Sequence, residues 1–111
     1  MLAAEIEPVR IIGRRRSLRE AVSLDARIER DGLKRALCKV VDLSLHGARL
    51  QTYSALRRGA TVWLTLPAIG TRAATIMWAD DFRAGCQFES ALDDDEFETL
   101  LDLDETLRRA W

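Results

Sequence analysis

The stretch VSLDARIERDG, residues 22–32, decides the fold of this chain. Apolar side chains alternate with polar ones from Val22 to Ile28, and a period of two predicts a strand with one buried face. Asp31-Gly32 then predicts a tight turn, because this pair suits the two-residue loops of β-hairpins. Residues 34–43 form a second apolar run, of which both faces are expected to be partly covered. The two runs together predict a hairpin.

Further runs of the same kind follow along the chain. The alternation predicts strands at residues 48–52, 61–66, 72–79 and 84–89. Turn-forming residues separate these runs, among them Pro67, Gly70 and the Asp80-Asp81 pair. About six short strands at near-regular spacing are typical of a small antiparallel barrel.

The apolar pattern changes its period at Asp93. Beyond this residue, apolar side chains recur every three or four positions, which predicts an amphipathic helix over about residues 93–110. Asp93 and Glu96 have the spacing of a capping box, and Arg108 and Arg109 lie at the end where the helix dipole favours cations. The expected fold is therefore mainly β: a small six-stranded antiparallel barrel with a C-terminal α-helix.

The length and composition fit one folded domain. A chain of 111 residues with 48% hydrophobic and 32% charged residues can bury a single modest core. We expect residues 1–13 to be a flexible lead-in and residues 14–111 to form the domain, with its barrel at about 20–90. No apolar run approaches ~18 residues, and the first residues carry acids where a signal peptide carries bases. The expected location is the cytoplasm, without insertion into a membrane.

The sequence predicts neither a metal site nor catalysis. Cys38 and Cys86 fall in apolar stretches without CxxC spacing, so both are interpreted as small buried hydrophobic residues. His46 is the only histidine in the sequence. It has no partner arrangement that is typical of a catalytic site.

A cationic centre precedes the first predicted strand. Four arginines lie within six residues on a chain whose formal net charge is only −1: Arg14, Arg15, Arg16 and Arg19. An anion is the natural partner of such a cluster, since guanidinium groups offer paired N–H donors to phosphates. By itself, such a cluster is more typical of a solvated basic patch than of a binding site.

A polar motif follows the second predicted strand. Asp42, Ser44 and Gly47 supply a carboxylate, a hydroxyl and a position where backbone can come close. These groups can recognise donors on the edge of a base. They are also common turn residues, so the motif is compatible with a plain strand-to-strand corner as well.

These two motifs resemble those of the PilZ domain, a bacterial receptor module for cyclic di-GMP. Its two arginines separated by three residues are similar to Arg15 and Arg19, and its Asp-x-Ser-x-x-Gly motif is similar to the segment from Asp42 to Gly47. The order of the motifs and the strand before the second one also match. The hairpin expected over residues 74–88 and the acidic final helix extend the resemblance over nearly the whole chain.

The resemblance implies a single-domain receptor with a PilZ-type barrel that binds cyclic di-GMP. Arg15 and Arg19 would bind its phosphates and stack on guanine. Asp42 would accept hydrogen bonds from guanine N–H groups, and Ser44 would reach a base or a phosphate. Gly47 would matter for the shape of the backbone more than for contact.

The resemblance also implies a change of conformation on binding. The segment before the first strand would fold across the ligand and bring its arginines to the face of Asp42 and Ser44. Arg14 would stack on a second ligand molecule, so that binding of one or of two molecules stays open. The change would be relayed to an unidentified partner protein, in motility, biofilm or envelope control. His46 would either crowd the ligand or contact it.

Other aromatic and acidic residues are interpreted as structural. Trp63, Trp78 and Trp111 lie in apolar patterns, which favours core or helix packing over base stacking, and Trp78 is expected nearest the ligand. Eight acids between Asp93 and Glu105, without a base among them, indicate a solvated helix face.

Three other classes of function stay open at this point. A PilZ-like adaptor would keep the fold and act in protein–protein interaction without the ligand. Nucleic acid binding is opposed by the near-neutral charge and the acidic helix. An enzyme has the least support, because the sequence has no nucleophile paired with a base and no Gly-rich phosphate loop. No cofactor and no metal are expected, and the oligomeric state is open.

Overall fold

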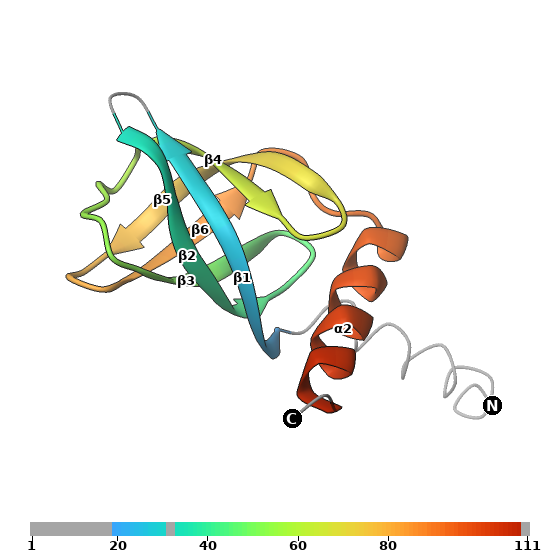
Figure 1. Cartoon of the computed structure of the whole chain (residues 1–111). Helices are drawn as coiled ribbons and strands as arrows, with labels where there is room; N and C mark the ends of the chain where they lie inside the picture. Colours follow the sequence, from blue (N-terminus) through green and yellow to red (C-terminus); the bar gives the residue numbers. More distant parts are fainter. Residues whose placement is uncertain (1–18, 31–32, 110–111) are drawn as a thin grey trace, which may run out of the picture.

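The computed structural model describes residues 19–30 and 33–109. Within these residues, strands β1 to β6 close into an antiparallel barrel in the order β1-β2-β3-β6-β5-β4, and helix α2 lies beside it (Figure 1). The elements are β1 (Glu20–Arg30), β2 (Leu33–Leu43), β3 (Gly47–Thr52), β4 (Thr61–Leu66), β5 (Gly70–Ala79), β6 (Arg83–Phe88) and α2 (Asp94–Arg109). The expected fold, a six-stranded antiparallel barrel with a C-terminal helix, is confirmed.

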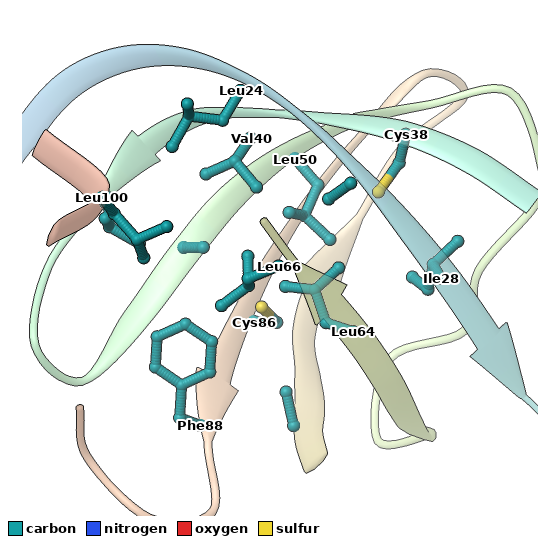
Figure 2. Close-up of a cluster of buried hydrophobic side chains, with 14 of the residues drawn as sticks. Leu24, Ile28, Cys38, Val40, Leu50, Leu64, Leu66, Cys86, Phe88 and Leu100 are labelled. Atoms are coloured by element: carbon teal, nitrogen blue, oxygen red, sulfur yellow. The ribbon is translucent and has the colours of Figure 1, made fainter. Parts of the chain in front are cut away.

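The core lies inside the barrel and is built from the alternation read in the sequence. In β1, Val22, Leu24, Ala26 and Ile28 are buried while the residues between them are exposed. Figure 2 shows side chains from several strands converging on the interior, with Leu100 of α2 at one side. The hairpin is confirmed by the antiparallel pairing of β1 with β2 up to Arg30 and Leu33. Its turn, Asp31-Gly32, lies outside the described residues.

Strand β2 meets only in part the expectation that both of its faces are partly covered, because Val41 is half-buried while Leu37 is not. Leu37 is 57% exposed, whereas Val40 and Leu43 are both fully buried. Two residues three positions apart can both face the core because the register of β2 against β3 shifts between Val40 and Asp42. This shift also turns Asp42, which strict alternation would place on the same side as Val40, away from the core.

The tryptophans correct a second expectation. Trp63 is 40% exposed and Trp78 is 38% exposed, so neither is a core residue. Trp63 occupies an outward position of β4 between the buried Val62 and Leu64. In β5 the register against β6 shifts between Ile76 and Trp78, which separates Trp78 from the inward face that Ile76 shares. Trp111 lies outside the described residues.

Helix α2 begins as its sequence predicts. The Asp93 carboxylate accepts a hydrogen bond from the N–H of Glu96 at 2.7 Å, and the Glu96 carboxylate accepts one from the N–H of Asp93 at 3.1 Å. This reciprocal pair is the expected capping box. The buried side chains Phe97, Leu100 and Leu101 form the apolar stripe of the helix. Among the described helices, none is both long and apolar enough to cross a membrane.

Replacing the capping residue Asp93 tests how much the cap of α2 contributes to the stability of the fold. Asp93→Ala is expected to lower the free energy of unfolding by about 1 kcal/mol, because the N–H of Glu96 loses its acceptor. Urea denaturation followed by circular dichroism measures the change. Asp95→Ala is the matched control, since it also removes one acid from the first turn. An equal loss in both variants would assign the effect to charge and not to the cap.

Candidate functional site

Four outward positions form a row across neighbouring strands of the barrel. Asp42 of β2 is the cross-strand partner of Arg49 in β3, Arg49 is the partner of Gly85 in β6, and Gly85 is the partner of Trp78 in β5. The row therefore runs carboxylate, guanidinium, glycine, indole. A recess beside the indole, with an aromatic wall on one side and charged groups on the other, suits a flat polar ligand.

Asp42 lies at the charged end of this row. Its Oδ2 is 3.9 Å from both Arg19 Nη1 and Arg49 Nη2, and its side chain is only 18% exposed. Its Oδ1 is buried, and within the described residues it has no hydrogen-bond partner. The same holds for Nε of Arg49. Buried polar atoms are rarely left unpaired. Both atoms are closed to solvent here, so a bound molecule would pair with this acceptor and this donor after a shift of the two side chains.

Ser44 shapes the corner between β2 and β3. Its hydroxyl oxygen accepts hydrogen bonds from the N–H groups of His46 at 3.3 Å and Gly47 at 3.2 Å, and its own N–H donates to the Gly47 carbonyl at 2.9 Å. Such a side chain replaces backbone bonds that a tight corner cannot make. The corner carries the chain from Asp42 to Arg49, so Ser44 acts on the site through the backbone.

Gly47 is required by the close approach of β3 and β6. A Cβ at this position would overlap the carbonyl oxygen of Cys86, a backbone atom that cannot move away without disturbing the ladder. Gly47 is also the cross-strand partner of Gln87. This glycine therefore permits strand packing beneath the site.

Gly85 is a second glycine with a steric role. A Cβ there would overlap the indole of Trp78, which therefore lies directly over the glycine. The absence of a side chain lets the indole lie down along the sheet, and the ring still keeps 38% of its surface exposed. An aromatic face presented in this way can stack on a base or on a guanidinium.

A cavity of about 250 Å³ opens over this row. The sequence motifs supply several of its walls: Arg19, Asp42, Ser44, His46 and Gly47. The remaining walls include residues that the motifs do not contain, namely Arg49, Met77, Trp78, Gly85 and Gln87. The structure thus brings Arg19 together with all of the second motif, while Arg14 and Arg15 lie outside the described residues.

Arg49 is a charged wall of the cavity that the sequence motifs do not contain. One signal was available, because Arg49 comes two positions after Gly47 and therefore shares its outward face on a short strand. Its pairing with Asp42 could not be predicted from the sequence, since that pairing depends on the register shift in β2. Met77 and Gln87 offered no signal beyond their outward positions in predicted strands.

The two cysteines are buried, as expected, and neither is disulfide-bonded. Burial raises the pKa of the Cys38 thiol from 9.0 to about 12, with smaller contributions from Cys86 and Asp25. Burial likewise raises the pKa of the Cys86 thiol from 9.0 to about 11, against a lowering by a hydrogen bond from the Ala48 backbone. Both thiols are therefore neutral hydrophobic residues at physiological pH.

These raised pKa values predict a loss of stability in alkali. The folded state favours the protonated thiols, so their stabilising contribution is complete below pH 9.0 and is lost as the pH rises from there to about 11 and 12. We expect the urea midpoint of the wild-type protein to fall more steeply than that of Cys38→Ala/Cys86→Ala between about pH 8 and pH 10.5. Parallel pH profiles would contradict this assignment.

A family model and several solved structures are similar to this chain, and they agree with one another. The family model described as PilZ domain matches residues 13–103. The PilZ domain of CeSA from a cellulose-synthesizing bacterium is 18% identical with a TM-score of 0.58, over 83% of this chain and 99% of that one. K. pneumonia MrkH in its apo state is 23% identical with a TM-score of 0.56, over 86% of this chain and 52% of that one.

A third solved structure is the complex of YcgR with c-di-GMP from Escherichia coli. It is 17% identical to this chain with a TM-score of 0.55, over 87% of this chain and 47% of that one. The chain thus spans about half the length of MrkH and of YcgR. No curated protein gives a significant match. At these identities the solved structures establish a shared fold.

Proposed function

Because the chain belongs to the PilZ domain family, we propose that it is a receptor for cyclic di-GMP and binds this ligand in the cavity between Asp42 and Trp78. The observation that carries the proposal is the buried Oδ1 of Asp42, which has no partner among the described residues. It lies beside two guanidinium groups, those of Arg19 and Arg49. The complex of YcgR with c-di-GMP, a protein of similar fold, supports the choice of ligand.

The ligand offers chemistry that matches each wall of the cavity. Its guanines carry N–H donors for the Asp42 carboxylate, and their O6 and N7 acceptors suit the paired donors of an arginine. Its two phosphodiester groups are anions for Arg19 and, earlier in the chain, Arg15. The exposed face of Trp78 provides a surface on which a base can stack.

Each residue of the site has a proposed role that follows from its position. Asp42 and Arg19 contact the ligand, and Ser44 holds the corner that presents them. Gly47 permits the packing of β3 on β6. We add Arg49 and Trp78 to the contacts expected from the motifs, since both line the cavity and flank Gly85. Arg14 is proposed to decide between one and two bound ligand molecules.

The proposed role of the domain is to sense and relay, not to catalyse. The family match indicates a binding domain and no catalytic family. Among the described residues, no group of histidines, cysteines and acids could hold a metal ion. We propose that ligand binding changes the arrangement of the arginine-bearing segment and that a partner protein in motility, biofilm or envelope control reads this change in the cytoplasm.

Titration calorimetry of the purified protein tests the proposal directly. We expect saturable binding of cyclic di-GMP and no comparable heat with GTP or cyclic di-AMP. The proposed contacts require two guanines and two phosphodiester groups in one ligand, and each control ligand lacks at least one of these. A stoichiometry of two that Arg14→Ala reduces to one would assign the second ligand to Arg14. A folded wild-type protein that binds none of the three would overturn the receptor and favour the ligand-independent adaptor.

A further inference from the structure

The last two turns of α2 contact the start of β1 through a buried carboxylate. Asp104 is only 5% exposed, although it carries a charge. Its Oδ1 accepts a hydrogen bond from the backbone N–H of Ser23 at 2.8 Å, and its Oδ2 is 3.1 Å from Arg108 Nη2. A charged group is expensive to bury unless it is paired and hydrogen-bonded, and here both conditions are met.

The contact coincides with an irregularity in β1. The register of β1 against β2 shifts between Ala21 and Leu24, so that Ser23 falls within the shifted stretch. At such a shift one strand carries an extra residue that has no regular partner in the ladder. The Asp104 carboxylate supplies the missing acceptor for Ser23. Arg108 adds a second link, because its Nη2 donates to the Ala21 carbonyl at 2.9 Å.

These four residues, Ala21, Ser23, Asp104 and Arg108, are called the β1 latch below. The latch lies next to the candidate ligand site, because Ala21 is the cross-strand partner of Asp42. Arg19 lies two residues before Ala21, and its guanidinium is 3.9 Å from the Asp42 carboxylate. The helix therefore holds the start of β1, two residues after Arg19.

We propose that Asp104 and Arg108 are positioning residues for the ligand site, which act by setting the place of Arg19 relative to Asp42. This inference rests on the proposed binding of cyclic di-GMP. Coupling between two sites is reciprocal in free energy, so a ligand that holds Arg19 also tightens the latch. Binding of the ligand is then transmitted to helix α2, on the other side of the latch from the ligand site.

The helix provides a matched control for the latch. Glu105 and Arg109 form an ion pair of the same spacing at 2.9 Å, one residue further along the chain. Both of these side chains are largely exposed. Glu105→Gln and Arg109→Ala therefore change the charge and the helix in the same way as Asp104→Asn and Arg108→Ala, without touching the latch.

The first measurement is the affinity for cyclic di-GMP of these four variants and the wild type, each at a temperature where circular dichroism shows it folded. We expect Asp104→Asn and Arg108→Ala to weaken binding about three- to tenfold, and the control pair to change it less than about twofold. Equal affinity in the latch and control variants, with the wild type binding, would overturn the inference alone. Absence of binding by the wild type would overturn the proposed function and the inference with it.

A double-mutant cycle separates positioning from a general loss of stability. If Arg108 acts through Arg19, then Arg108→Ala has little further effect on affinity in an Arg19→Lys background, where the paired donors of the guanidinium are already gone. Undiminished weakening in that background would contradict a role through Arg19. Hydrogen exchange gives the reciprocal readout: saturating ligand is expected to slow exchange of the Ser23 amide in the wild type, and unchanged exchange would overturn the coupling.

Discussion

Replacement of Arg15 and Arg19 together by alanine is expected to weaken cyclic di-GMP binding by at least about 100-fold, without unfolding the protein. Hydrogen bonds to charged groups contribute about 1.5–3 kcal/mol each, and every 1.4 kcal/mol is tenfold in affinity. The loss of two guanidinium contacts, even at the lower value of about 1.5 kcal/mol each, therefore weakens binding by slightly more than about 100-fold. Titration calorimetry measures the loss, and circular dichroism verifies that the barrel is retained.

The chain contains a suitable control for the charge that this double variant removes. Arg57 and Arg58 are adjacent, exposed and absent from the walls of the cavity. Arg57→Ala/Arg58→Ala removes the same two charges, and its affinity is expected to stay within about twofold of the wild type at physiological salt, where distant charges are screened. Similar weakening in both double variants would show that net charge, and not the arginine motif, controls binding.

The largest expected effect on stability belongs to Gly47. Gly47→Ala is expected to lower the free energy of unfolding by about 3 kcal/mol or to prevent folding, because the new Cβ overlaps a backbone oxygen of β6. Strands β3 and β6 pair throughout this region, so neither can shift without disturbing several ladder bonds. Since small domains are stable by only about 5–15 kcal/mol, such a loss is readily detected as a lower urea midpoint.

Gly85→Ala provides the comparison for this prediction. Its Cβ would meet the indole of Trp78, a side chain that can rotate toward solvent, so the loss of stability is expected to be about 1 kcal/mol. The exposed indole then leaves its place over the glycine, which should alter the tryptophan fluorescence. A larger destabilisation by Gly85→Ala than by Gly47→Ala would show that the steric assignment of the two glycines is wrong.

The elements of the fold were predictable because their signals are local. In strand β1, buried and exposed side chains alternate without a break from Val22 to Ile28, and this period of two indicates a strand with one buried face. The capping box of Asp93 and Glu96 involves residues three positions apart, so no tertiary information is needed to recognise it. The two expected hairpins also followed, since short connections favour antiparallel pairing.

The candidate site was predictable only in part. Its motifs identified Asp42, Ser44 and Gly47 as a group, and the structure places all three at one cavity with Arg19. Arg49 and the exposure of Trp78 were not predictable, because each depends on a shift of register between strands. In β2 and β5 the shift changes which face the next residues occupy, and the sequence carries no mark at the residue where it occurs.

The sequence by itself determined that the chain forms short alternating strands followed by a capped amphipathic helix, and that arginines and an Asp-x-Ser-x-x-Gly motif flank the first hairpin. These properties depend on residues near one another in the chain. Only the tertiary structure decided that Asp42 points outward, that Arg49 and Trp78 stand on either side of Gly85, and that Asp104 reaches Ser23 across the molecule. These contacts join residues far apart in sequence, so they exist only once the barrel has closed and the helix has packed beside it.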